Sequence, residues 1–225
     1  MTMAEKTSFA AIGGAGGAGG LWTDVAARLD VLVIPLPDEP DVPAMARSVR
    51  DRIAALPQPR VLVGASAGAM VALEVAREAR VQALVLISAG WGIEVSESAL
   101  NWVRENPPDL HQKLAKICVA DRENIKRLEV IEADYDACTQ PVHLRHLEAL
   151  SRHRPAPLPD PPPTLVLWGM ADRAVPMEDH LQLALQCRGA LVPIAEAAHV
   201  PYYEQPDIVV RWIRHAASLA RDGAM

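Results

Sequence analysis

The sequence feature that most constrains this chain is a serine set among small residues, in the segment Val61-Leu62-Val63-Gly64-Ala65-Ser66-Ala67-Gly68. The aliphatic run before the serine predicts a buried β-strand, and the Ala-rich amphipathic run after it predicts a helix. A chain that turns from strand to helix within about one residue brings the two backbones nearly into contact, so only Gly or Ala fits beside the turn. The turn also places the hydroxyl at a helix N-terminus, where the helix dipole favours developing negative charge. The Gly64-x-Ser66-x-Gly68 pattern therefore predicts a nucleophilic serine.

Predicted strands and helices alternate along both ends of the chain. Aliphatic and β-branched runs predict six strands: Ser8–Ile12, Val31–Leu36, Val61–Val63, Ala83–Ser88, Thr164–Trp168 and Ala190–Ile194. Apolar residues at helical spacing predict helices between and after them: Leu21–Leu29, Val42–Leu56, Ala67–Ala79, Glu178–Cys187 and Pro206–Leu219. This alternation predicts an α/β fold with a mostly parallel, doubly wound sheet of about six strands.

The middle of the chain, residues 93–163, breaks this alternation. It carries no strand signal and ends in a stiff Pro-rich connector at residues 155–163. Four helices are predicted there: Glu97–Glu105, Pro108–Val119, Arg122–Ala133 and Val142–His153. A crossover between parallel strands needs only about a dozen residues, and the apolar stripes of these helices need a surface to cover. We therefore predict an α/β core of residues 1–92 and 164–225, with residues 93–163 as a helical cap over Ser66. The alternative is a helical subdomain packed beside the sheet.

Composition limits the partners and the compartment. The 225 residues carry a formal net charge of −6, which argues against nucleic acid or an anionic membrane as the main partner. Three widely spaced cysteines, Cys118, Cys138 and Cys187, form no C-x-x-C or His/Cys cluster, so we expect free thiols, a reducing compartment and no metal. The first residues lack an apolar signal core, and no run approaches 18 apolar residues. These features predict a cytoplasmic protein with no membrane segment.

Two further residues follow predicted strands at the edge of the sheet where Ser66 is expected. Asp172 comes three residues after Gly169, which ends one predicted strand, and His199 follows the last predicted strand. Ligands bind along the carboxyl edge of the sheet in open α/β folds. The chain order Ser66, Asp172, His199 predicts a catalytic triad, in which His199 takes the serine proton and Asp172 orients the imidazole. The alternatives are that Asp172 only caps the next turn and that His199 is a solvated loop residue.

The other ionisable residues are weaker candidates. Glu196 and Glu204 flank His199 and compete weakly with Asp172 for the role of the acid. We expect solvated positions for the remaining histidines, which fall on predicted helices: His111, His143, His146, His153, His180 and His215.

A glycine-rich loop, residues 13–20, follows the first predicted strand and allows two interpretations. Gly14-x-Gly16-x-x-Gly19 precedes a helix, and Asp38 and Glu39 lie about 20 residues further on, which fits a dinucleotide-binding fingerprint. The acids, however, follow a Pro-Leu-Pro segment instead of standing at the tip of the second strand. The other interpretation is an oxyanion loop, in which small residues let a backbone N–H approach the substrate oxygen. The predicted triad favours the oxyanion loop and has no role in the dinucleotide interpretation.

Together these motifs resemble the α/β-hydrolase fold family, in particular its small serine esterases and lactonases with a helical cap. The residues that carry the resemblance are the glycine loop ending in Leu21-Trp22, the elbow at residues 64–68, the acid turn at residues 169–176, and Ala198-His199 followed by Glu204-Gln205-Pro206. The resemblance implies Ser66 as nucleophile, with Asp172 and His199 as its partners. It also implies an oxyanion hole formed by the N–H groups of Ala15 and Ala67. We expect Gly14, Trp22, Trp91 and Trp102 at the substrate, although Trp91 and Trp102 fit the core of the cap equally well.

The chain departs from the family pattern at two points. Gly13 stands where the family usually has a His that braces the oxyanion loop, which weakens the assignment of the Ala15 N–H. The usual N-terminal pair of strands has no room before Ser8, so Val31–Leu36 should be an exposed edge strand. Pro35 and Pro37 would blunt that edge, and a homodimer contact is the other way to cover it.

These observations predict a serine hydrolase that cleaves a small or medium, mostly uncharged carboxylic ester or lactone through an acyl-enzyme on Ser66, without a cofactor. The alternative is a ligand-binding or non-hydrolytic protein of the same fold, such as an ester or lactone binder, a C–C hydrolase or a perhydrolase. A dinucleotide-binding protein that uses the glycine loop is the minor alternative.

Overall fold

The computed structural model describes residues 6–222 of the chain. Within them lies one sheet of six strands in the order β2-β1-β3-β4-β5-β6, with every neighbouring pair parallel. The strands are β1 (Ser8–Ile12), β2 (Val31–Ile34), β3 (Arg60–Ala65), β4 (Ala83–Ile87), β5 (Thr164–Gly169) and β6 (Ala190–Ile194). All six expected strands are present, and the sheet is entirely parallel.

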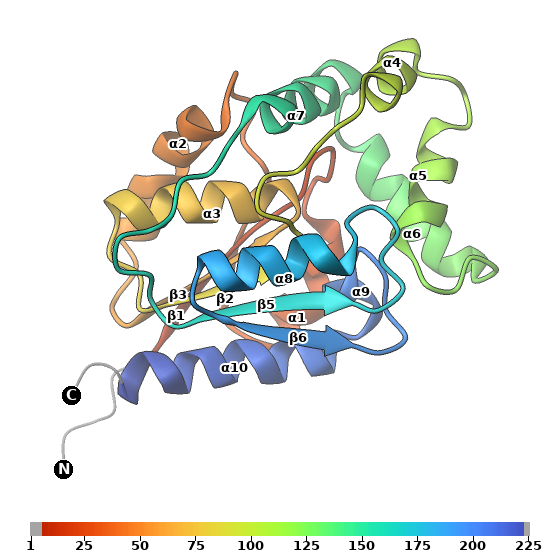
Figure 1. The fold of residues 1–225 in the computed structure, drawn as a ribbon. Helices are drawn as coiled ribbons and strands as arrows, with labels where there is room; N and C mark the ends of the chain where they lie inside the picture. Colours follow the sequence, from red (N-terminus) through yellow and green to blue (C-terminus); the bar gives the residue numbers. More distant parts are fainter. Residues whose placement is uncertain (1–5, 223–225) are drawn as a thin grey trace.

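Helices cover both faces of this sheet, as Figure 1 shows. One face packs against α2 (Val42–Ala54), α3 (Ala67–Glu78) and α8 (Met177–Gln186), and the other against α1 (Thr23–Arg28) and α10 (Pro206–Asp222). Successive strand residues alternate between the two cores: Leu62 of β3 faces α3, whereas Val61 and Val63 face α10. Strands buried on both faces must be apolar throughout, which is why β3 and β4 read as continuous aliphatic runs.

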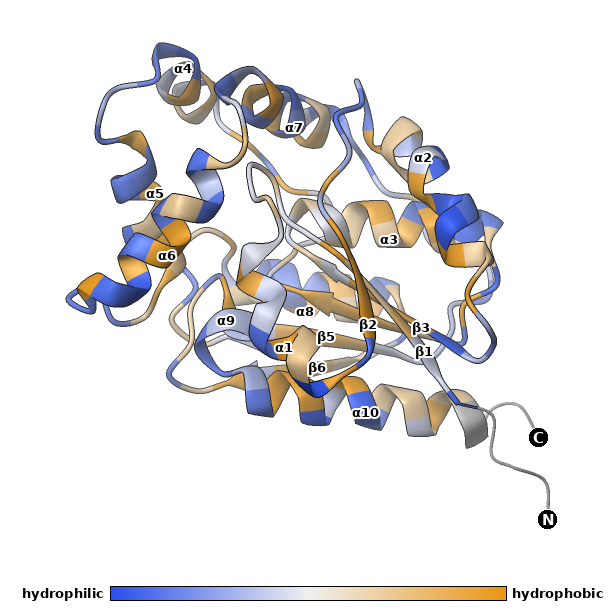
Figure 2. Cartoon of the chain, turned by 180° about the vertical axis from the view of Figure 1, so that it is seen from behind, coloured by the Kyte–Doolittle hydropathy of each residue, from blue (hydrophilic) through white to orange (hydrophobic). Residues whose placement is uncertain are grey.

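The helices begin and end close to where the sequence predicts. Asp41 caps α2 by accepting a hydrogen bond from the Ala44 N–H at 2.7 Å, and Pro43 lies in the first turn. The expected first helix is split into a 3₁₀ turn, η1 (Gly20–Trp22), and α1. The short helix α9 (Pro201–Glu204), between the last strand and α10, was not predicted. Figure 2 shows hydrophobic strands at the centre and hydrophilic residues on the outward side of α10.

Four helices connect β4 to β5: α4 (Glu97–Glu105), α5 (Leu110–Cys118), α6 (Ile125–Asp136) and α7 (Gln140–Arg152). In Figure 1, α5 and α6 lie beyond the carboxyl ends of the strands, and α7 lies over the helix layer that contains α3. The apolar stripes of these helices are mostly covered, since Leu110, Leu128 and Ile131 are buried. Ile125, the first residue of α6, is 67% exposed.

The strand β2 is at the edge of the sheet, as the sequence predicts. It ends at Ile34, and Pro35 and Pro37 follow it instead of lying within it. Its first three residues are half-buried. Among the described residues, no helix is both long enough and apolar enough to cross a membrane.

Candidate active site

Ser66 occupies a sharp turn between β3 and α3. Its backbone has φ 51° and ψ −120°, a strained conformation for a residue with a side chain. The turn brings the two elements so close that a Cβ on Gly64 would lie 2.4 Å from the Gly68 carbonyl oxygen. A Cβ on Gly68 would lie 2.4 Å from the carbonyl oxygens of both Ile12 and Gly13. Glycine is therefore required at both positions, for the steric reason that the sequence pattern implied.

The start of α3 and the glycine loop both lie beside Ser66. Ala67 is the first residue of α3, so its N–H has no partner within the helix. The glycine loop approaches the serine from the other side, because a Cβ on Gly14 would lie 3.4 Å from the Ser66 Cβ. Gly14 and Ala15 both line the cavity into which Ser66 opens. A Cβ on Gly13 would meet nothing closer than 3.8 Å, and the Gly13 N–H donates to the Ile34 carbonyl at 2.9 Å, which ties the start of the loop to β2.

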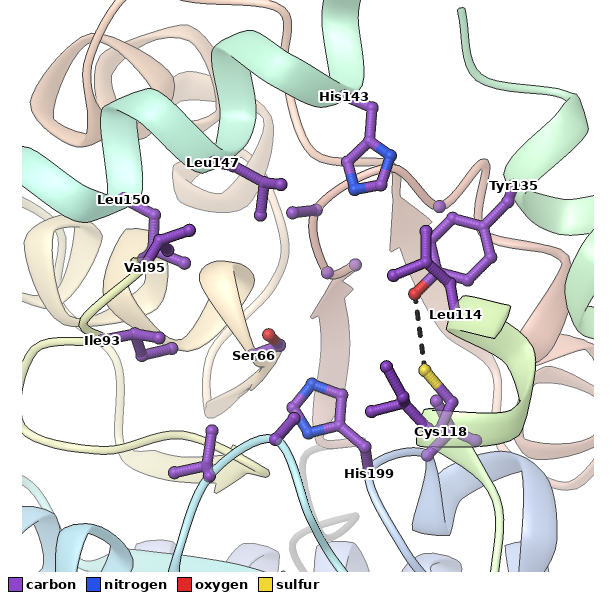
Figure 3. Close-up of a pocket in the computed structure, with 18 of the residues that line it drawn as sticks. Ser66, Ile93, Val95, Leu114, Cys118, Tyr135, His143, Leu147, Leu150 and His199 are labelled. Atoms are coloured by element: carbon purple, nitrogen blue, oxygen red, sulfur yellow. Dashed lines mark hydrogen bonds between the residues drawn. The ribbon is translucent and has the colours of Figure 1, made fainter. Parts of the chain in front are cut away.

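Asp172 and His199 form a direct pair at the carboxyl edge of the sheet. The Nδ1 of His199 lies 2.9 Å from Oδ2 and 3.2 Å from Oδ1 of Asp172. The Asp172 side chain is fully buried, whereas that of His199 is 14% exposed and lines the same cavity as Ser66. Figure 3 shows Ser66 beside the imidazole of His199 in that cavity. Within residues 6–222, the Ser66 hydroxyl makes no hydrogen bond, which leaves it open to a ligand.

The environment of Asp172 favours its ionised form. Burial alone raises the pKa of a carboxyl group, but the nearby His199 and two backbone N–H groups outweigh burial and hold the pKa of Asp172 below its ordinary value. Those N–H groups belong to Ala174 and Val175 and donate to Oδ1 at 2.8 and 3.1 Å. Asp172 thus caps its own turn and also binds His199. Capping the turn and orienting the imidazole, which the sequence offered as alternatives, occur together.

Glu204 and Glu196 do not contact His199. The buried carboxylate of Glu204 accepts the Ala198 N–H at 2.6 Å and the Ala120 N–H at 2.8 Å. It therefore links the loop that carries His199 to the segment after α5. The His199 N–H donates to the Cys118 carbonyl at 3.0 Å across the same junction. Glu196 is exposed. Of the three acids considered, only Asp172 reaches the imidazole.

Ser66 and His199 open into a cavity of about 390 Å³. Its walls are mostly apolar and come from the sheet edge, the glycine loop and all four helices α4–α7. The apolar side chains that face Ser66 across the cavity include Ile93, Val95, Leu114, Leu147 and Leu150, as Figure 3 shows. Residues 93–163 thus supply much of the cavity wall.

The three tryptophans have different positions relative to this cavity. Trp22 lines it, and its ring stacks on Tyr202 with centroids 4.1 Å apart. Trp102 of α4 also lines it. Trp91 is not among the lining residues and packs against the core on the α3 side of the sheet. The structure therefore places Trp91 against the core and outside the cavity, contrary to the expectation that it contacts substrate.

The glycine loop is wrapped around a carboxylate of the protein itself. Asp134 of α6 is buried, and its Oδ1 accepts the Gly20 N–H at 2.6 Å. Burial raises the pKa of Asp134, while the N–H groups of Gly20, Ala18 and Gly19 oppose that rise. Such a cradle of N–H groups before a helix is the place where a dinucleotide would set its pyrophosphate.

The acid of the dinucleotide fingerprint is also engaged elsewhere. Asp38 forms a double ion pair with Arg145 of α7, at 2.7 and 2.6 Å. The other acid, Glu39, has no side-chain hydrogen bond or ion pair within the described residues, but Asp134 fills the cradle that a pyrophosphate needs. The geometry favours the oxyanion interpretation.

Three histidines expected to be solvated are buried: His143, His146 and His180. His146 bridges two loops, accepting the Gly16 N–H at Nδ1 and donating from Nε2 to the Pro37 carbonyl. Each of the three shares one face of its helix with apolar residues, at the spacing i, i+3, i+4 and i+7. On α7 the face consists of His143, His146, Leu147 and Leu150, and on α8 it runs through His180, Leu183, Ala184 and Cys187. That spacing marks the inward face of a helix and would have identified them. Of the others, His215 is exposed, whereas His111 and His153 are partly covered.

All three cysteines are free thiols, and none lies in a metal-binding cluster. Cys118 and Cys187 are buried, and burial raises the pKa of their thiols to about 12 and about 11. Cys118 lines the cavity, and its Sγ contacts the Tyr135 hydroxyl at 3.4 Å. Among residues 6–222, no three His, Cys, Asp or Glu side chains gather as ligands for a metal ion.

Comparisons with known proteins place the chain in a family. Solved structures with the same fold include a thermophilic esterase (TM-score 0.82, 18% identity, covering 96% of this chain and 91% of that one). Another is a thermophilic esterase from Thermogutta terrifontis (TM-score 0.79, 21% identity, 96% and 90%). A third is the enol-lactonase from Burkholderia xenovorans LB400 (TM-score 0.80, 17% identity, 95% and 92%). A search of curated protein sequences gives no match. The sequence model of the alpha/beta hydrolase family matches residues 12–212, most of the chain, and the protein therefore belongs to that family.

Proposed function

We propose that the protein is a serine hydrolase that cleaves a carboxylic ester or lactone through an acyl-enzyme on Ser66. One observation carries the proposal: His199, paired with the buried Asp172 carboxylate, lines the same cavity as the strained Ser66. A serine hydroxyl is a weak nucleophile until a base removes its proton. In this proposal His199 is the base, and the Asp172 carboxylate binds its Nδ1, which leaves Nε2 to accept the proton.

The proton moves in two directions during the reaction. The carboxylate of Asp172 accepts the Nδ1–H of His199, so Nε2 has the free lone pair that takes the Ser66 proton. As Ser66 attacks the carbonyl carbon, the N–H groups of Ala67 and Ala15 stabilise the oxyanion. His199 then gives its proton to the leaving alcohol. A water molecule activated by the same imidazole releases the acid from Ser66.

The cavity indicates an uncharged substrate of moderate size. Its wall is mostly apolar, and a volume of about 390 Å³ is within the range of small-molecule sites. In this proposal, helices α4–α7 cover part of the cavity and reduce the water near Ser66, which strengthens the electrostatic contacts to the oxyanion. Solved structures of the same fold include esterases and an enol-lactonase, so both substrate types belong in the first screen.

A fluorophosphonate probe is expected to label the protein once per chain, at Ser66, because the probe reacts only with an activated serine. Intact-mass measurement and peptide mapping locate the adduct, and Ser66→Ala is the matched control. Labelling should be accompanied by hydrolysis of p-nitrophenyl esters of graded chain length or of lactones. Labelling at another residue, or none, would refute the proposal, whereas labelling with saturable ester binding but no product would favour the ligand-binding alternative.

Replacing Trp102 with Ala is expected to shift the preference among p-nitrophenyl esters toward longer acyl or bulkier alcohol groups, by about tenfold, because one pocket contact is worth about 1–3 kcal/mol. The rate of fluorophosphonate labelling should stay within about tenfold of wild type. Trp91→Ala is the matched control, since Trp91 packs on the core outside the cavity and should leave the preference unchanged. Equal shifts from both variants, or none from Trp102→Ala, would mean that α4 does not select the substrate.

A further inference from the structure

His143 is a polar side chain set into the apolar wall of the cavity. It lies on α7, one turn before Leu147 and two turns before Leu150, and all three line the cavity. Figure 3 shows its ring on the far side of the cavity from Ser66 and His199. The residue is 4% exposed, so this ring is removed from bulk water yet borders the space that a substrate would fill.

The ring is held in place by packing alone. It stacks on Tyr135, with ring centroids 5.5 Å apart and planes 23° apart. On another side it contacts the glycine loop so closely that a Cβ on Gly16 would lie 2.6 Å from the ring. Gly16 has φ 72°, and its lack of a side chain provides the room that the ring occupies. The chain thus orients the imidazole firmly without using either of its nitrogens.

Within the described residues, neither ring nitrogen of His143 has a hydrogen-bond partner. Its polar neighbours in the wall are already engaged: the Tyr135 hydroxyl contacts Cys118, and the Asp134 carboxylate accepts the Gly20 N–H. The buried His146, one turn further along α7, uses both of its nitrogens. Both nitrogens keep some accessible surface, unlike the enclosed unpaired ring nitrogens of His153 and His180. A substrate that displaced water from them without a hydrogen bond would lose about 1–3 kcal/mol. The imidazole of His143 is therefore available to hydrogen-bond a group that enters the cavity.

His143 is uncharged at neutral pH. Burial first, and then the nearby His146 and His111, lower the pKa of its imidazole to about 4. A neutral imidazole has one N–H donor and one nitrogen acceptor. It is suited to an uncharged carbonyl or hydroxyl group and gives no ion pair with a carboxylate or phosphate.

We infer that His143 is a specificity-determining residue that hydrogen-bonds an uncharged oxygen of the substrate, a keto or hydroxyl group remote from the ester bond that Ser66 attacks. The inference rests on the proposed ester hydrolysis and narrows its substrate class to oxygenated acyl or alcohol groups. The apolar wall around Leu147 and Leu150 contacts the carbon chain of the substrate, and His143 hydrogen-bonds the oxygen that the chain carries.

The test uses p-nitrophenyl esters in matched pairs. Hexanoates that carry a keto group at carbon 3, 4 or 5 are compared with hexanoates that carry a methyl branch at the same carbon, which is similar in size and cannot hydrogen-bond. The measured quantity is the ratio of kcat/KM for each keto ester to that of its methyl partner. Because each ratio is compared between wild type and variant, differences in the intrinsic reactivity of the esters cancel.

His143→Phe keeps a ring against Gly16 and Tyr135 but has no ring nitrogen. For at least one keto position, we expect this variant to lower the ratio by about tenfold, the value of one buried hydrogen bond. His143→Gln, which retains a donor and an acceptor, should restore part of the ratio. Leu147→Met is the matched control on the same helix: it reshapes the apolar wall and should change both members of a pair alike. If His143→Phe does not unfold cooperatively in urea, His143→Leu takes its place.

The same pairs also test the inference without turnover. In Ser66→Ala protein, the Kd of each ester is measured by quenching of tryptophan fluorescence, with and without His143→Phe. The inference is supported if His143→Phe reduces the preference for the keto ester over its methyl partner, measured as a ratio of Kd values, by about tenfold. This holds even if the wild-type protein hydrolyses no ester, an outcome that would reject only the proposed function. Unchanged ratios in both experiments, at all three keto positions, would overturn the role of His143.

Discussion

Replacing His199 with Ala is expected to lower kcat/KM for p-nitrophenyl esters by roughly 10³-fold or more. The imidazole is proposed to serve as base for Ser66 and then as acid for the leaving alcohol, so Ala removes both functions at once. The fold should survive, because the side chain is partly exposed to the cavity and the backbone N–H of residue 199 still donates to the Cys118 carbonyl. Steady-state kinetics with fluorophosphonate labelling measure the loss, and urea unfolding checks the fold.

Two further variants make this result specific. The double variant Ser66→Ala/His199→Ala should be no slower than either single variant. The two residues act as one unit, so removing the second has no further effect once the first is gone. His215→Ala is the matched control: the His215 side chain is exposed on α10 and lies against the Trp212 ring, so its loss should leave the rate within about twofold of wild type. A His199→Ala protein with near wild-type activity would remove His199 from the mechanism.

The sheet was predictable from the sequence because its strands are buried on both faces. Burial on both sides demands unbroken aliphatic runs, and β3 and β4 show them clearly. The element ends were less certain, since they depend on single capping contacts: α6 begins three residues later than expected, where Asn124 accepts the Arg127 N–H at 3.2 Å. The helix α9 was missed because four residues carry too little periodic pattern to detect.

The arrangement of the cap was only partly predictable. Helical stripes indicate that a face is covered but not which surface covers it. Trp91 and Trp102 both follow β4 and look equivalent in the sequence, yet only Trp102 reaches the cavity. The contact between the Asp134 carboxylate and the glycine loop could not be predicted. It joins segments 114 residues apart through backbone N–H groups, which every residue type except proline has.

The buried histidines show a different kind of error. His143 and His146 were assigned to solvated faces because histidine is usually exposed or intermediate in burial. Their spacing with Leu147 and Leu150 placed them on the inward face of α7, and the spacing was the better guide. In both cases, helical periodicity should have outweighed the average preference of the residue type.

Replacing Asp172 with Asn is expected to lower kcat by roughly 10³–10⁴-fold, although the amide is nearly the same size as the carboxylate. The Oδ1 of residue 172 accepts the N–H groups of Ala174 and Val175, so the oxygen of Asn must stay there. Its NH₂ group then faces His199, where Oδ2 now lies 2.9 Å from Nδ1. An NH₂ at that position donates to Nδ1, which places the imidazole proton on Nε2, the nitrogen that must accept the Ser66 proton. Steady-state kinetics at neutral pH measure the loss.

Glu204→Gln is the comparison that distinguishes a carboxylate needed for catalysis from one needed for stability. Glu204 does not touch His199 and holds the N–H groups of Ala198 and Ala120, so Gln should cost stability, about 1–3 kcal/mol, and change kcat by less than about tenfold. A nearly silent Asp172→Asn together with a severe Glu204→Gln would reverse the two assignments.

Stability measured by urea unfolding across a range of pH should separate the same two carboxylates. The folded-state pKa of Asp172 lies below its unfolded value, so its stabilising contribution is present above the unfolded pKa of about 3.9 and is lost as the pH falls through the folded value. The stability difference between wild type and Asp172→Asn should therefore shrink on acidification. Burial raises the pKa of Glu204, so the folded protein binds that proton first, and the contribution is present below the unfolded pKa and lost as the pH rises through the folded value. The difference between wild type and Glu204→Gln should therefore grow on acidification, and changes of the same sign for both variants would contradict this account of the two acids.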